Sequence, residues 1–124
     1  MKPADLIWNR ACFDTYFSPR AGDIALRALL RAHGLTMNGG VFHAIECLSD
    51  SELLNAIAGY RFFGLDSAVE VLLRAKRLIE EKGDLGSQEV VLDKAYAAVI
   101  PDDSFIVQRF KQHLESHPLD FAPL

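Results

Sequence analysis

The sequence predicts an all-α fold, a compact single-domain bundle of about six to seven helices. The chain has 124 residues, a length that suits one domain with one core, so we expect residues 1–124 to form a single unit. Apolar residues recur with the helical period of 3.6, and glycine and proline separate the periodic segments. No alternating pattern supports a sheet, although β-branched residues gather in "VVL" and "AAVI".

Each expected helix begins or ends at a residue with a suitable conformational preference. Pro3 fits the first turn of a helix, where its missing N–H does no harm. Asp23 is a good N-cap and Gly34 a good C′ residue for the second helix. Ser49 or Ser51 can cap the fourth, and "DLGS" is expected to be a loop. The expected helices cover residues 3–17, 23–34, 41–48, 49–64, 65–83, 88–100 and 102–117.

Two of these segments have a clear apolar side. Residues 65–83 keep the helical period for four turns, from Leu65 to Ile79. In residues 49–64 the expected buried side consists of Leu53, Leu54, Ile57, Tyr60 and Phe63.

Composition limits the function classes. The formal charge is −4, from 17 acidic and 13 basic residues, which disfavours direct nucleic-acid binding because a basic face is expected there. The first ten residues lack the apolar stretch of a signal peptide, and no segment reaches the ~18 apolar residues of a membrane helix. We therefore expect a cytoplasmic protein that binds neither membrane nor nucleic acid.

Cysteine and histidine give no metal site that the spacing supports. Cys12 and Cys47 are too few and too far apart for a disulfide framework, and their apolar neighbours predict buried free thiols. His113 and His117 have the spacing of two ligands on one helix face. Pro118 biases His117 away from helical geometry, so a frayed helix end is the expected structure.

Catalytic signatures are also absent from the sequence. It contains no Gly-x-Ser-x-Gly elbow, no GxGxxG and no P-loop. We therefore expect a non-enzymatic protein with no cofactor.

The segment "NGG", Asn38 to Gly40, stands directly before the apolar run "VFHAIECL". In one interpretation Gly39 and Gly40 give the turn a positive φ or let another element approach closely, with Asn38 as cap of the helix that begins near Val41. In the other, the exposed N–H groups bind an anion. The first is preferred because no lysine or arginine follows within ten residues.

Acidic residues gather in two groups in the second half of the chain. Acid–base catalysis would require a cleft that shifts their pKa values, whereas in loops and caps carboxylates are solvated. Asp102 or Asp103 is expected to cap the last helix. The candidate acidic interaction surface consists of Glu80, Glu81, Asp84, Glu89, Asp93, Asp102 and Asp103.

Most of the chain resembles the bacterial DNA-mimic-protein-like domain family, an all-helical domain of unknown function with an Asn-Gly-Gly motif. The resemblance covers roughly residues 21–121 and includes the segments "MNGGVFHAIECLSD", "GYRFFGLDSAVEVLLRAKRLI" and "LDKAYAAVIPDDSFIVQRFKQHLESHPLDF". Met37, His43 and Ala44 occupy positions where the family often has a second Asn and a Gln. The matched residues are Asn38, Gly39, Gly40, Phe42, Gly64, Ala68, Leu92, Asp93, Tyr96 and Phe121.

The resemblance implies an all-helical fold and an acidic surface that imitates DNA phosphates and occupies a DNA-binding protein. Our first hypothesis is accordingly a protein-interaction domain that binds a DNA-binding or other basic protein. The second is an immunity-type inhibitor of a toxin or enzyme, again through an acidic face. The third is a small-ligand or enzymatic domain with a pocket at the Asn-Gly-Gly turn that uses Asn38, His43 and Glu46.

Overall fold

The computed structural model describes residues 2–13 and 17–124. Within these ranges the structure is all-helical and contains no strand, as the sequence predicts. Helices follow one another with short connections. The elements are α1 (Pro3–Cys12), α2 (Ala21–Gly39), α3 (Val41–Cys47), α4 (Asp50–Phe62), α5 (Asp66–Glu80), α6 (Leu85–Val99), α7 (Asp103–Ser116) and the 3-10 helix η1 (Pro118–Asp120).

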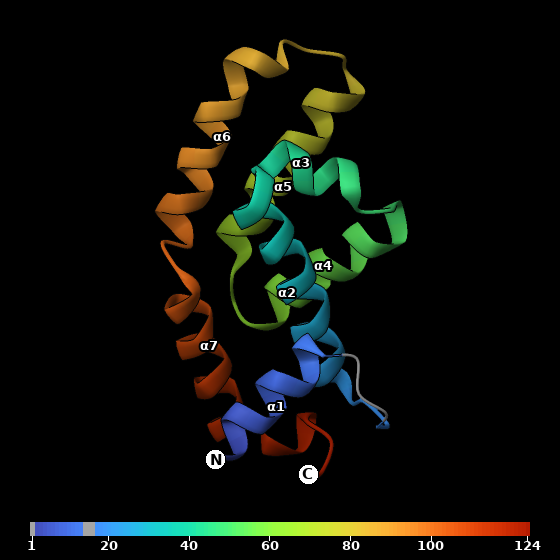
Figure 1. Cartoon of the computed structure of the whole chain (residues 1–124), viewed down its shortest axis with the longest axis vertical. Helices are drawn as coiled ribbons and strands as arrows, with labels where there is room; N and C mark the ends of the chain where they lie inside the picture. Colours follow the sequence, from blue (N-terminus) through green and yellow to red (C-terminus); the bar gives the residue numbers. More distant parts are fainter. Residues whose placement is uncertain (1, 14–16) are drawn as a thin grey trace.

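Helix α2 lies at the centre of the bundle and packs against α1, α3 and α4 (Figure 1). Helices α6 and α7 follow each other along one long side, and the loop between α5 and α6 is at the end opposite the two termini (Figure 1). The core is one hydrophobic cluster that extends from Ile7 to Phe121. Leu26, Leu29 and Ala32 of α2 are completely buried in it.

The first two helices differ from their expected bounds. Helix α1 ends at Cys12, and Phe17 lies outside any helix; Tyr16, expected in the same helix, is outside the described residues. Helix α2 begins at Ala21, so Asp23 is not its N-cap. Asp23 is in the first turn, and its side chain accepts a hydrogen bond from the Arg20 N–H at 3.0 Å.

The expected end of α2 at Gly34 is also wrong. The helix continues for five more residues, with Gly34 exposed in its interior. His33 and Thr36, on either side of the glycine, are both buried. The stabilisation from their contacts exceeds the ~1 kcal/mol that a single glycine costs in a helix.

Several helix ends agree with the sequence. Ser49 caps α4 and forms a capping box with Glu52. Asp102 caps α7 by accepting a hydrogen bond from the Phe105 N–H at 3.1 Å. Gly64, which follows α4, has φ +73°. This conformation lets the Leu65 N–H donate a hydrogen bond to the Tyr60 carbonyl in the last turn of α4. The expected loop "DLGS" is instead the start of α6, which begins at Leu85.

Two burial predictions are wrong. Leu54 is 67 % exposed, although the other four residues of its expected set are buried. Cys12 and Cys47 are both exposed. Successive residues of a helix point about 100° apart, so an apolar neighbour in the sequence does not place a side chain on the same face.

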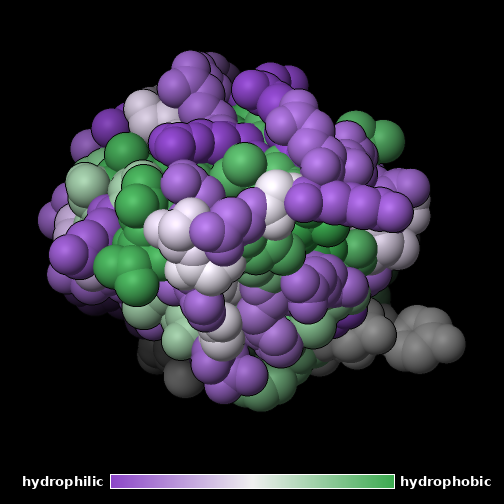
Figure 2. All heavy atoms as spheres, turned by 90° about the horizontal axis from the view of Figure 1, so that it is seen from above, coloured by the Kyte–Doolittle hydropathy of each residue, from purple (hydrophilic) through white to green (hydrophobic). Residues whose placement is uncertain are grey.

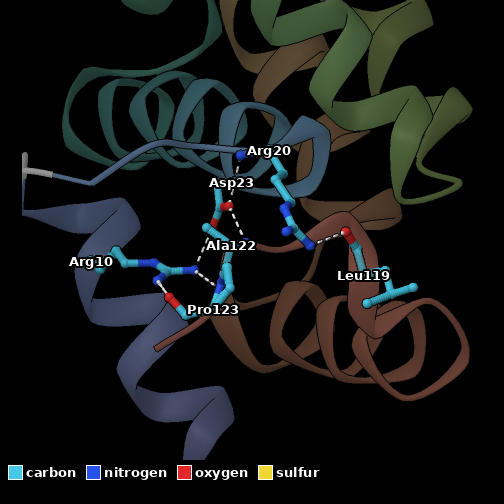
Figure 3. Close-up of polar contacts among 6 residues, drawn as sticks. All are labelled: Arg10, Arg20, Asp23, Leu119, Ala122 and Pro123. Carbon is cyan, nitrogen blue, oxygen red and sulfur yellow. Dashed lines mark hydrogen bonds and ion pairs between the residues drawn. The ribbon is translucent and has the colours of Figure 1, made fainter.

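A buried ion pair holds the C-terminal segment against the first two helices (Figure 3). Arg10 Nη2 lies 2.9 Å from Asp23 Oδ1, and the Arg10 and Asp23 side chains are 12 % and 1 % exposed. Asp23 Oδ2 accepts a hydrogen bond from the Ala122 N–H at 2.8 Å. The Arg10 guanidinium donates to the carbonyls of Ala122 and Pro123, and Arg20 donates to that of Leu119. The contact therefore joins segments about a hundred residues apart.

Candidate interaction surface

Helix α6 buries only one of its sides. Leu92 and Tyr96 are in the core, where α6 packs against α5 and α3. The opposite side faces solvent along the edge of the molecule (Figure 1). Small and apolar residues predominate there, although polar residues usually cover the outer side of a surface helix. We call this set the α6 face: Gly86, Ser87, Val90, Val91, Lys94, Ala97 and Ala98, all exposed.

The two valines are the largest apolar side chains of the α6 face. Val90 is 59 % exposed and Val91 is 45 % exposed. Figure 2, which views the end with the α5–α6 loop, shows apolar residues interrupting the polar surface on the side where α6 stands in Figure 1. The sequence predicts a helix over "VVL", although its β-branched residues would also suit a short strand, and no pattern in it distinguishes the buried Leu92 from the exposed valines.

The protein's negative charge is concentrated around this helix. Residues 80–103 contain seven of the 17 acidic residues and two of the 13 basic ones, a net charge of −5. The other 100 residues have ten acidic and eleven basic residues, a net charge of +1. The predicted acidic residues thus lie along α6, in the two connections that join it to α5 and α7, and at the adjoining ends of those two helices.

Several of these carboxylates also have local structural partners. Asp84 caps α6 by accepting from the Ser87 N–H at 3.2 Å. Glu80 lies 3.4 Å from Lys76, one turn earlier on α5. Hydrogen bonds from the Ser104 hydroxyl and the Phe105 N–H lower the pKa of the Asp102 carboxyl. These groups remain exposed, so their charge contributes to the surface while they fix helix ends.

Asp93 differs from the other acids because it is half-buried and bonded to another helix. Its Oδ1 accepts a hydrogen bond from the Val41 N–H, the first of α3, at 2.8 Å. Gly40 has φ +97°, and a Cβ at this position would lie 3.0 and 3.1 Å from the two Asp93 oxygens. The glycine thus provides both the backbone conformation and the space for the carboxylate. The anion at this helix start is the protein's own Asp93.

The structure confirms the conformational interpretation of the Gly-Gly pair but not the role of Asn38. Asn38 lies in the last turn of α2, and the residue before α3 is Gly40. A Cβ at Gly39 would lie 2.5 Å from the ring of His43, so this glycine allows close approach. Phe42 is buried in the core.

A hollow of about 270 Å³ lies beside the Asn-Gly-Gly turn. Its lining does not include Asn38, His43 or Glu46, the residues that the third hypothesis requires. His43 instead lies against the Cys47 sulfur, 3.7 Å from each ring nitrogen. The hollow is lined by Thr36, Met37, Gly40, Asp93, Tyr96, Ala97, Ile100 and Pro101.

A chain of buried hydrogen bonds links four helices behind α6. The Tyr60 and Tyr96 hydroxyls are 2.6 Å apart, and the Tyr96 hydroxyl is 2.8 Å from His33 Nδ1. His33 Nε2 is 2.7 Å from Asp103 Oδ1. Burial raises the pKa of both tyrosines, so their hydroxyls stay protonated and serve as donors. The arrangement stabilises the junction of α2, α4, α6 and α7 rather than presenting a nucleophile.

The remaining histidines show no metal geometry. His113 Nε2 lies 2.7 Å from Asp120 Oδ2, and its ring packs against Phe62. Helix α7 ends before His117, as Pro118 predicts. In residues 2–13 and 17–124 no three His, Cys, Asp or Glu residues come together as a metal site would require. None of the helices described there is both long enough and apolar enough to cross a membrane.

Comparison of the chain with protein-family models, curated proteins and solved structures finds no match. The resemblance to the DNA-mimic-protein-like family therefore stays a prediction.

Proposed function

We propose that this protein is a non-enzymatic interaction domain that binds a basic, amphipathic surface of another protein through the α6 face. The observation that carries the proposal is the apolar solvent side of α6 within a segment of net charge −5. The solvent side of a surface helix is usually polar, whereas Val90, Val91 and small residues occupy most of the solvent side of α6 around Lys94.

The composition of the surface resembles that of a protein–protein interface. Interfaces commonly have an apolar centre, which supplies most of the affinity, and a polar rim. Val90 and Val91 form such a centre, with Asp84 and Glu89 near the start of α6 and Asp102 just beyond its end. Acidic side chains at the rim favour a basic partner, because complementary charge speeds association and fixes orientation.

The partner class includes DNA-binding proteins, whose basic surfaces would meet the acidic segment. An immunity-type inhibitor would use the same face and differ only in its target, such as a basic toxin or enzyme. No contact of the described residues favours the small-ligand hypothesis in its original form, since its three residues do not line the hollow.

The test compares two charge substitutions on exposed apolar residues of different helices. Val90→Arg replaces one of the two valines of the α6 face with a second cation beside Lys94. Leu54→Arg, at a residue 67 % exposed on α4, is the matched control. Each purified variant is immobilised and exposed to lysate of the source organism, and the bound proteins are eluted with increasing salt.

We expect a basic protein that binds the wild type and Leu54→Arg but binds Val90→Arg at least about tenfold more weakly, because the arginine both repels the partner and fills the apolar centre. Binding should weaken as salt rises, since salt screens the contacts of the acidic rim. Equal binding by both variants would contradict the assignment of the α6 face.

A further inference from the structure

The hollow beside the Asn-Gly-Gly turn is continuous with the α6 face. Ala97 belongs to both, and Pro101 follows one turn after it. Met37, at the end of α2, forms the opposite wall and is 57 % exposed. Apolar side chains therefore border the hollow on the side of the α6 face, and a partner that covers this face also covers the hollow.

Asp93 provides the one carboxylate among the residues that line this hollow. Asp93 Oδ1 is occupied by the Val41 N–H at 2.8 Å, whereas Oδ2 has no hydrogen-bond donor among the described residues. Because Gly40 has no side chain, the Asp93 carboxylate packs directly against its backbone at the edge of the hollow. No lysine or arginine is among the residues that line the hollow, so none of them neutralises the carboxylate.

Apolar walls around one carboxylate complement an aliphatic cation. A lysine or arginine side chain buries its methylene stem along apolar surface and keeps its charged head on a hydrogen-bonding partner. Hydrogen bonds between such a head and a carboxylate are charge-assisted and stronger than neutral ones. An apolar or anionic side chain would leave the second oxygen of Asp93 without a donor, and a neutral donor would leave its negative charge uncompensated.

We propose that this hollow receives a lysine or arginine side chain from the protein that binds the α6 face, with Asp93 Oδ2 as the acceptor for its charged head. This inference rests on the proposed function and adds to it a specificity-determining residue.

The test uses small probes, so it does not require the partner. Isotope-labelled protein is titrated with n-butylammonium and n-butylguanidinium, and separately with 1-butanol, a neutral molecule of similar size and shape. Amide chemical shifts of Gly40 and Ala97 are followed by NMR, with Leu54 as a distant reference. We expect both cations to cause saturable shifts. We expect 1-butanol to bind at least about tenfold more weakly than either cation.

Asp93→Asn is the informative variant, because the amide oxygen still accepts from the Val41 N–H while the charge is lost. The variant should keep the wild-type fold, judged by its dispersed spectrum, and bind the cations about tenfold more weakly or not at all. An equal response to 1-butanol, or cation binding that Asp93→Asn leaves unchanged, would overturn the inference.

The outcomes for the hollow and for the α6 face are distinguishable. If the cations bind but Val90→Arg and Leu54→Arg capture the same proteins, the hollow is a cation site and the proposed interaction surface fails. If Val90→Arg alone loses the partner and the cations do not bind, the interaction surface stands and the role of Asp93 fails.

Discussion

Gly40→Ala should destabilise the protein by about 2–4 kcal/mol. Gly40 has φ +97° and ψ 174°, a conformation that is essentially restricted to glycine, and a residue with a Cβ there costs about 1–3 kcal/mol. The new Cβ would lie 3.0 Å from Asp93 Oδ2. The carboxylate must then give by a few tenths of an ångström, which weakens its hydrogen bond with the Val41 N–H, a helix cap worth about 1 kcal/mol.

Gly34→Ala is a control for the same chemical change. Gly34 lies in the interior of α2, and a Cβ at this position meets no atom within 4 Å. Alanine has the better helix propensity, so this variant should be more stable than the wild type by about 0.5–1 kcal/mol. Urea unfolding followed by circular dichroism measures both changes. A Gly40→Ala variant within about 0.5 kcal/mol of wild type would refute the argument for the turn.

The other predictions concern the contacts that hold the helices in place. Asp23→Asn should lower the free energy of unfolding by about 3–5 kcal/mol, because Arg10 keeps a largely buried charge without its counter-ion; a loss under about 1 kcal/mol in urea would contradict this. Tyr96→Phe should cost about 2–4 kcal/mol, since it leaves a buried imidazole nitrogen and a buried hydroxyl without their shared partner, whereas Tyr60→Phe should cost about 1 kcal/mol. The reverse order, by the same measurement, would show that the chain of hydrogen bonds is not formed as described. Asp102→Ala should destabilise the protein near neutral pH, and the difference from wild type should disappear in acid. The pKa of Asp102 is lower in the folded state, so its contribution is present above the unfolded value of 3.8 and is lost as the pH falls through the folded value. A difference that is independent of pH in thermal melts would argue against capping by the charged carboxylate.

The fold class could be predicted from the sequence because helical periodicity and caps are local signals. Residues 65–83 show this best, since every apolar residue from Leu65 to Ala75 on the expected side is buried in α5. Ser49 and Asp102 cap the helices they were expected to cap. The predicted end of α2 at Gly34 was wrong, because the tertiary contacts that extend α2 to Gly39 cannot be seen in the local sequence.

The candidate site was only partly predictable. Asp93 was expected to belong to an acidic surface and Gly40 to have a special conformation, but 52 residues separate Asp93 from the Val41 N–H that it caps. That contact depends on how α3 and α6 meet, which no local pattern specifies. The exposure of Val90 was missed for a similar reason. An apolar residue on a helix predicts burial, and only the packed fold shows which side of α6 lacks a neighbour.

Site-specific photo-crosslinking at Val90 tests directly whether the α6 face binds a partner. A photoreactive phenylalanine derivative replaces Val90 in one variant and Leu54 in another, and both are irradiated in cells of the source organism. We expect a crosslinked product of defined mass, containing a basic protein, from the Val90 variant and not from the Leu54 variant. Crosslinking at Leu54 and none at Val90 would contradict binding of a partner by the α6 face. A product of twice the protein's own mass would show that the α6 face binds a second copy instead.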